Sequence, residues 1–170
     1  IDIGDDVSEI MLYNPTLQNL KVKNGLNVTK ADYMLTGNGT MLYILDGGVI
    51  DLSDFTGKPT SAKYMFMGGI PRESNIIIPN SILSNAIDAS GAFQYSNEKM
   101  DLLKPIDVSG LDFSNLNNMK EMFSSNRPVV EPEVDAGEIS IKNQISNQQS
   151  LNCERMFSYA PYTSLDFGLQ

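Results

Sequence analysis

The sequence predicts an α/β repeat solenoid, a stack of parallel strands with short helices on the opposite face. Five apolar anchor residues recur at intervals of 31, 27, 30 and 34 residues. A short apolar-x-apolar triplet precedes each anchor by 15 to 18 residues. One phrase, Ile-Asp-Leu/Val-Ser, occurs twice, at 50–53 and at 106–109. Self-similarity at a period of 20 to 50 residues indicates a stacked-repeat architecture, in which each unit is one strand, a loop and a helix.

The anchors predict the helical part of each unit. In the fourth unit Met119, Met122 and Phe123 stand at i, i+3 and i+4, which is one face of a helix. The same three columns are apolar in every unit, and a core is needed in every unit whereas a ligand site is needed once. We therefore expect core rather than a cofactor or binding groove. The columns are Ala31, Ala62, Ala89, Met119, Cys153; Met34, Met65, Ala92, Met122, Met156; and Leu35, Phe66, Phe93, Phe123, Phe157.

The triplets predict parallel strands with one inward and one outward face. Strand signals stand at 20–22, 50–52, 76–78, 106–108 and 139–141, and a sixth at 165–167 opens a further unit. Side chains alternate along a strand, so the central residue of each triplet points outward, and neighbouring strands align these residues in a row. We expect the outward row to bind a partner. It consists of Lys21, Asp51, Ile77, Asp107, Ser140 and Asp166.

A second outward row follows two residues later on each strand. Its members are Lys23, Ser53, Pro79, Ser109, Lys142 and Gly168. Lys23 and Lys142 from this row complete the candidate partner-binding set. The competing interpretation is structural, because Asp and Ser side chains cap turns through hydrogen bonds to nearby backbone. It applies to Asp51, Ser53, Asp107 and Ser109, whereas Lys21, Ile77, Ser140 and Lys142 depart from the repeated phrase.

The segment 106–123 resembles the repeat of BspA-like bacterial leucine-rich-repeat surface proteins, whose consensus is Leu-Asp-Leu-Ser-x-Phe-Asp-Thr-Ser-x-Val-x-Asn-Met-x-x-Met-Phe. The resemblance extends over about residues 11–168 and is strongest in the second and fourth units. It implies a leucine-rich-repeat-like fold and an extracellular adhesion role on a bacterial surface, with a protein or glycan partner. The identical positions are Asp107, Ser109, Asp112, Ser114, Asn118, Met119, Met122 and Phe123.

The length of 170 residues fits a single repeat domain. Its units run roughly over 11–35, 36–66, 67–93, 94–123 and 124–157, with a partial unit at 158–170. Because the sequence starts at Ile1 and ends within a strand signal, we expect a fragment of a longer protein. A long irregular insertion at 127–137 predicts a surface loop, either tolerated or part of the binding surface.

Composition excludes several functions. The net charge is −9 with 12 Lys and Arg and no histidine, so nucleic-acid binding lacks its basic surface. A zinc site or a Ser triad lacks its usual imidazole, and the single cysteine, Cys153, forms no intrachain disulfide and is expected to be a buried small hydrophobe. The sequence contains no run of 18 apolar residues, so it predicts no membrane span.

Catalysis and metal binding are also disfavoured. Asp51, Asp107 and Asp166 fall on alternate strands, about 10 Å apart, beyond the roughly 5–9.5 Å used by paired glycosidase carboxylates. Calcium could use the Asp51 and Asp54 pair or the N-terminal Asp2, Asp5 and Asp6, but exposed carboxylates are usually only solvated. We expect a non-enzymatic module with no cofactor and no metal. The alternative is a phage virion component such as a tail or head-fibre domain in a larger assembly, since related repeats occur in phage proteins.

Overall fold

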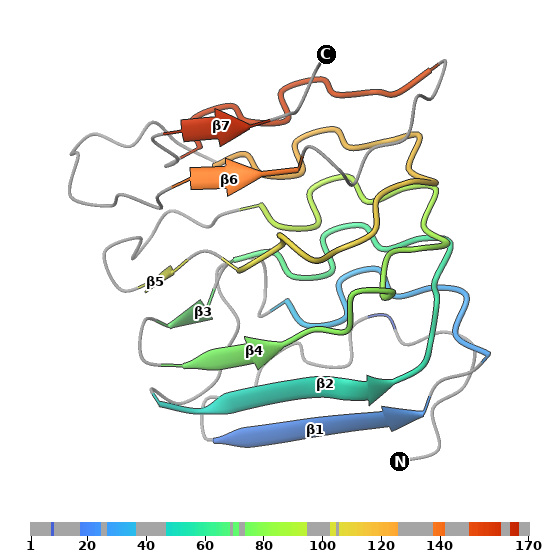
Figure 1. Ribbon diagram of the computed structural model, residues 1–170, viewed down its shortest axis with the longest axis vertical. Coiled ribbons are helices and arrows are strands. Elements are labelled where there is room, and N and C mark those ends of the chain that lie inside the picture. Colours follow the sequence, from blue (N-terminus) through green and yellow to red (C-terminus); the bar gives the residue numbers. More distant parts are fainter. Residues whose placement is uncertain are drawn as a thin grey trace.

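The computed structural model describes residues 8, 18–24, 27–36, 47–68, 70–71, 74–94, 103–104, 106–125, 138–141, 150–160 and 164–166. Within these residues the chain rises in successive coils from β1 near the N-terminus to β7 near the C-terminus (Figure 1). The strands are β1 Asn19–Asn24, β2 Val49–Phe55, β3 Ile70–Pro71, β4 Asn75–Ile77, β5 Leu103–Lys104, β6 Glu138–Ser140 and β7 Ser164–Asp166.

The first three coils form a parallel sheet in the order β1-β2-β4. Leu20 lies opposite Ile50, which lies opposite Ile76, so the apolar starts of the triplets are in register. Strands β6 and β7 pair in parallel near the C-terminal end, and β3 pairs with β5 antiparallel in the connections between coils. Each parallel neighbour is reached only after a full coil of chain, because parallel strands require a crossover connection.

The segment 106–108 keeps the strand alternation without being a regular strand. Ile106 and Val108 are buried, whereas Asp107 between them is exposed. Farther along the same coil, the N–H of Asp112 donates to the carbonyl of Asn80 at 3.1 Å, which ties the fourth coil to the third. The inward and outward faces expected for this triplet are therefore present.

Each coil continues into a turn segment, at 30–36, 61–68, 88–94, 118–125 and 152–160. These segments are joined in sequence by parallel bridges that link Lys30, Ser61, Asp88, Asn118 and Asn152. Within each junction the N–H groups of one turn donate to the carbonyls of the next: Ala62 donates to Asp88 at 2.9 Å and Phe66 donates to Ala92 at 2.8 Å. The turn segments thus form a second hydrogen-bonded face across the core from the sheet.

The expected helices are absent from the part of the chain that the structure describes. At each anchor the backbone makes two tight turns, such as Met122 N–H to the Met119 carbonyl and Ser124 N–H to the Glu121 carbonyl, both at 3.1 Å. Between them stands a residue with positive φ, which breaks the helix. The amides that a helix would use internally instead bond to the neighbouring coil. The positive-φ column is Tyr33, Tyr64, Gly91, Glu121 and Arg155.

Gly91 shows why this column has one glycine. A Cβ at Gly91 would lie 2.2 Å from the Cε1 atom of Tyr64, because the Tyr64 ring lies over it. Tyr33 stacks in turn on Tyr64 with ring centroids 5.0 Å apart. At φ +63, glycine pays no steric cost, whereas the other members of the column accept the left-handed conformation with a side chain.

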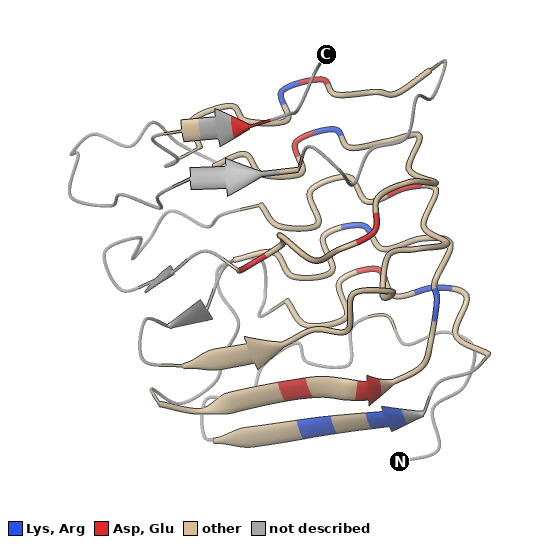
Figure 2. Cartoon of the chain, viewed as in Figure 1, with Lys and Arg blue, Asp and Glu red and all other residues tan. Residues whose placement is uncertain are grey.

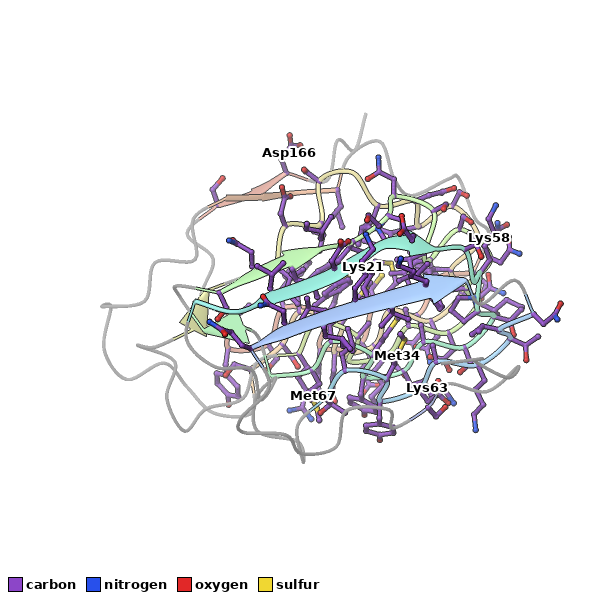
Figure 3. The ribbon with its side chains drawn as sticks, turned by 90° about the horizontal axis from the view of Figure 1, so that it is seen from below. Lys21, Met34, Lys58, Lys63, Met67 and Asp166 are labelled. Carbon is purple, nitrogen blue, oxygen red and sulfur yellow. The ribbon has the colours of Figure 1, made fainter. Side chains whose placement is uncertain are left out.

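The core lies between the sheet and the turn segments, and the anchor columns supply much of it. Met34, labelled in Figure 3, is fully buried below the sheet. Phenylalanine rings stack along the coils, with centroids 5.3 Å apart for Phe66 and Phe93, 5.6 Å for Phe93 and Phe123, and 5.3 Å for Phe123 and Phe157. The core role predicted for the anchors is confirmed for Leu35, Phe66, Phe93 and Phe123.

Cys153 corrects one expectation. It was predicted to be buried like Ala31, Ala62 and Ala89 in its column, but it is exposed. Those alanines are each covered by the next turn segment, whereas Cys153 belongs to the last turn that the structure describes. Partial burial raises the pKa of its thiol, which keeps it protonated near neutral pH and makes it a weak nucleophile.

A third stretch of each coil, the flank segment, connects strand to turn. The flank segments are 27–29, 56–60, 85–87, 115–117 and 150–151, and the first four alternate exposed and buried residues. The N–H of Thr60 donates to the Thr29 carbonyl at 2.9 Å, and the N–H of Ile87 donates to the Thr60 carbonyl at 2.9 Å. The flank segments therefore form a further face of the stack, with its own row of outward side chains.

Candidate functional site

The first half of the predicted outward row is aligned across the sheet. Lys21 of β1 lies opposite Asp51 of β2, and Asp51 lies opposite Ile77 of β4. The order along the row is therefore cation, anion, apolar side chain. Figure 2 shows the two lysines of β1 in blue beside the two aspartates of β2 in red.

Lys21 is the electrostatic centre of this face. Its Nζ lies 2.9 Å from Oδ2 of Asp51 and 3.1 Å from Oδ2 of Asp54. The hydrogen bond to Asp51 raises the pKa of the Lys21 ammonium. The hydrogen bond from Lys21, followed by those from Ser53, lowers the pKa of Asp51 well below its ordinary value. Lys21 and Asp51 are therefore both charged at neutral pH.

Ile77 gives the row an apolar member. It is 48% exposed, and the alternation that points Lys21 and Asp51 outward points it outward too. A single exposed isoleucine is ordinary on a protein surface, but here it adjoins a mixed-charge cluster. Ile77 therefore places an exposed apolar side chain next to the charged residues of the row.

The second half of the row is placed in part. Asp107 is exposed, as the predicted register requires, and Ser140 lies opposite Asp166 between β6 and β7. Figure 3 shows Lys21 and Asp166 pointing to the same side of the molecule, away from the turn segment of Lys63. Lys142 lies outside the described residues.

The second outward row is displaced by a bulge. The register of β1 against β2 shifts between Lys21 and Lys23, so Lys23 lies opposite Asp54 rather than opposite Ser53. An extra residue in one strand of a pair moves every later partner by one position. The expected pairing of Lys23 with Ser53 is therefore wrong, and Asp54, which was not among the predicted partner-binding residues, joins the site through this shift.

The structural alternative for the Asp-x-Ser phrase is confirmed by its hydrogen bonds. Oδ1 of Asp51 accepts from the Ser53 N–H, and Oδ1 of Asp107 accepts from the Ser109 N–H, both at 2.9 Å. Asp112 makes the same bond to the Ser114 N–H at 2.9 Å. One carboxylate oxygen of each aspartate thus holds the backbone N–H two residues later, and at Asp51 the other oxygen binds Lys21.

The same hydrogen bond, from a backbone N–H to the side chain two residues earlier, recurs at positions where the sequence did not predict it. Oδ1 atoms of Asp88, Asn118 and Asn152 accept from the N–H two residues later at 3.0, 3.1 and 3.0 Å. Burial raises the pKa of Asp88, but the hydrogen bonds from Ser90 and Asn118 outweigh it and the net shift is downward. The sequence signal was an Asp or Asn immediately before Ala89, Met119 and Cys153 in the last three units.

The described residues include no group of three or more Cys, Asp and Glu that could hold a metal ion. The charged groups of Asp51 and Asp54 both pair with the ammonium group of Lys21. Among the described residues, no helix is long and apolar enough to cross a membrane.

Comparison of the chain with protein-family models, with curated proteins and with solved structures finds no significant match in any of the three.

Proposed function

We propose that this chain is a leucine-rich-repeat-like solenoid of the BspA-like kind, which works outside the cell as a recognition module and binds a protein partner through the exposed face of its parallel sheet. The row formed by Lys21, Asp51 and Ile77 carries this proposal, because one outward residue per strand places charge and apolar surface side by side.

The mixed character of the row favours a protein partner over other ligands for this face. A salt-bridged cation with a neighbouring apolar side chain suits a surface that has both charged and apolar groups, and charge complementarity contributes more to orientation and association rate than to raw affinity. The ordered backbone beneath the row holds its side chains in place before binding, which reduces the entropy lost on association.

A direct test uses immobilised extracellular proteins and the purified chain. Lys21→Glu combined with Ile77→Asp reverses the charge at the centre of the row and removes its apolar member. We expect this double variant to bind at least about tenfold more weakly than the parent, since a disrupted contact at the middle of an interface costs about 1.4 kcal/mol or more.

Lys63→Glu is the matched control. Lys63 pairs with Asp88 on the turn face, at 3.5 Å, and points away from the sheet row. The control variant should bind like the parent. Equal loss in both variants, or no protein ligand for the parent chain, would contradict the proposal and favour a purely structural role such as that of a virion fibre.

A further inference from the structure

The flank segments enclose an open groove of about 680 Å³ that is separate from the sheet row. Its volume lies in the range of roughly 300–1,000 Å³ that is typical of small-ligand sites. Three successive coils contribute to it, at the point where β1 and β2 end and the chain turns toward the turn segments. The residues that line this flank groove are Asn27, Val28, Thr29, Thr56, Lys58, Thr60 and Asn85.

Backbone alternation explains how the groove acquires polar walls. Thr56, Lys58 and Thr60 are exposed, while Gly57 and Pro59 between them are buried. Three polar side chains from one segment therefore project from the same face. Figure 3 shows Lys58 pointing outward beyond the end of β2.

The neighbouring flank segments add to the same walls. Asn27 and Thr29 are exposed on either side of Val28, which is buried, and Asn85 is exposed before Ala86, which is buried. Backbone hydrogen bonds from Thr60 to Thr29 and from Ile87 to Thr60 hold the three segments side by side. More of the lining surface is apolar than polar, because Val28, the threonine methyl groups and the aliphatic parts of the polar side chains contribute to it.

Four of the polar side chains in the groove take no part in the hydrogen bonds and ion pairs among the described residues. Among these residues, Asn27, Thr56, Lys58 and Asn85 make no side-chain hydrogen bond and no ion pair. Exposed asparagines elsewhere do support the fold: Oδ1 of Asn19 accepts from the Val49 N–H at 3.2 Å, and Nδ2 of Asn115 donates to the Ser84 carbonyl at 2.6 Å. The groove thus gathers amide, hydroxyl and ammonium groups whose hydrogen-bonding capacity remains available to a ligand.

The net charge of the chain, rather than the groove lining, disfavours a polyanionic ligand. Lys58 is the one charged residue among the described residues of the lining, and its field also acts on Asp112, whose pKa is lowered chiefly by the hydrogen bonds from Ser114 and to a lesser degree by Lys58. The chain as a whole carries −9. A polyanionic ligand would find one cation in a negatively charged molecule, whereas a neutral ligand would meet no such penalty.

We propose that the flank groove binds a neutral oligosaccharide. Amide and hydroxyl side chains each donate and accept hydrogen bonds, as sugar hydroxyl groups do, so Asn27, Thr56 and Asn85 match a hydroxyl-rich ligand from two sides. Val28 and the threonine methyls contact its C–H groups. A chain of linked sugars fits a groove that crosses three coils, since each coil contributes polar side chains to it.

The test begins with an array of oligosaccharides that includes neutral, sialylated and sulfated members, probed with the purified 170-residue chain. We expect binding to neutral members, followed by titration calorimetry with the tightest of them. Asn27→Ala combined with Asn85→Ala should weaken that binding by at least about tenfold, because it removes amide groups from both walls. Lys58→Met should change it by less than about threefold, since a neutral ligand does not depend on the charge.

Asn117→Ala is the matched control, because Asn117 is exposed on a flank segment but does not line the groove. It should bind like the parent, and all variants should keep the parent's thermal unfolding midpoint. The Lys21→Glu and Ile77→Asp double variant should also keep glycan binding, which separates this site from the sheet face. Binding of only acidic oligosaccharides, binding of none, or unchanged binding by the Asn27 and Asn85 double variant would overturn the proposal.

Discussion

Single residues carry the apolar stability of this molecule through the stacked phenylalanine rings. Phe123 is fully buried and lies between Phe93 and Phe157, at 5.6 and 5.3 Å. It therefore has ring contacts on both faces. Loss of such a side chain removes its burial and leaves a cavity that the neighbouring rings cannot fill without breaking their stacking.

We predict that Phe123→Ala lowers the free energy of unfolding by about 3–5 kcal/mol. Chemical denaturation monitored by circular dichroism measures this value. Phe157→Ala should cost less, because Phe157, which stacks on Phe123, is partly exposed. A Phe123→Ala variant as stable as the parent would show that the anchor columns are assigned to the wrong register.

The ion pair at Lys21 predicts a pH response of one carboxylate. The pKa of Asp51 is lowered in the folded protein, first by the hydrogen bond from Lys21. When the pKa of a carboxyl is lower in the folded than in the unfolded state, the group stabilises the fold at pH values above its unfolded pKa, about 3.9. This stabilisation is lost as the pH falls from there through the folded pKa. Because the group is exposed, we expect this contribution to be small.

Lys21→Met removes the largest cause of the shift. We predict that the pKa of Asp51 rises in this variant but stays below its ordinary value, since the Ser53 hydrogen bonds remain. An NMR titration of the side-chain carboxyl carbons measures it, with Asp112 as an internal reference because its shift arises mainly from Ser114. No change at Asp51 would mean that the ion pair is not formed in solution.

At the scale of the elements, the strands were predictable and the turns were not. The triplets at 20–22 and 50–52 alternate apolar and charged residues, and this alternation indicates which face is buried. The triplet at 76–78 is three isoleucines, and its outward residue follows from the place of the triplet in the repeat. The alternation and the repeat together fixed the alignment of Lys21, Asp51 and Ile77. The bulge before Lys23 has no such signal, because it depends on how β1 packs against β2.

The helix prediction failed for a physical reason. Apolar residues at i, i+3 and i+4 meet on one face of a helix, but they meet equally in two consecutive tight turns, as at Ala31, Met34 and Leu35. What decides between them is the lateral bonding, for example the Leu35 N–H to the Met65 carbonyl at 2.9 Å. Those partners lie about 30 residues away, and a local pattern cannot show them. Gly91 was the one local hint of positive φ.

The caps of the strand-to-turn connections yield a prediction at this scale. Asp107→Ala removes the acceptor of the Ser109 N–H and should lower the free energy of unfolding by about 0.5–1.5 kcal/mol. Asp107→Asn keeps an oxygen acceptor and should stay within about 0.5 kcal/mol of the parent. Urea denaturation compares the two. Equal loss in both would indicate that the charge of Asp107, rather than its cap, is what matters.

The flank groove was invisible in the sequence for a related reason. Its walls come from Asn27, Lys58 and Asn85, which belong to three different coils and share no motif. Their relation appears only when the backbone brings the coils side by side. What the sequence did contain was a set of asparagines and threonines at alternating positions, which resembles ordinary exposed loop composition.

At the scale of the whole molecule, stability should depend on position along the stack. Each coil contacts its neighbours, so a central coil is supported on two sides and a terminal one on fewer. The order of strands β1, β2 and β4 was predictable because consecutive repeats lie beside each other. The connections holding β3 and β5 were not, because their lengths differ from unit to unit.

Native-state hydrogen exchange tests this dependence. The Phe93 N–H, bonded to the Met122 carbonyl at 2.9 Å in a central coil, should exchange more slowly than the Ser158 N–H, bonded to Arg155 within the last described turn. The expected difference in exchange rate is tenfold or more, since the free energy of local opening at an end should be lower than in a central coil by about 1.4 kcal/mol or more. Equal protection at both amides would show that the described coils unfold as one unit.

The one-way hydrogen bonds between turn segments have an electrical consequence. In each of the second, third and fourth turn segments, three peptide groups point their carbonyls toward the preceding coil and their N–H groups toward the following coil. In the second turn segment the carbonyls that accept are those of Ser61, Lys63 and Met65, and the N–H groups that donate are those of Ala62, Tyr64 and Phe66. Ordinary sheets nearly cancel their peptide dipoles, whereas aligned peptide groups add. This face therefore carries a net dipole along the stack, with its positive end toward the C-terminal coil. Every coil joined in the same sense lengthens that dipole, so the two ends of the stack attract ions of opposite sign.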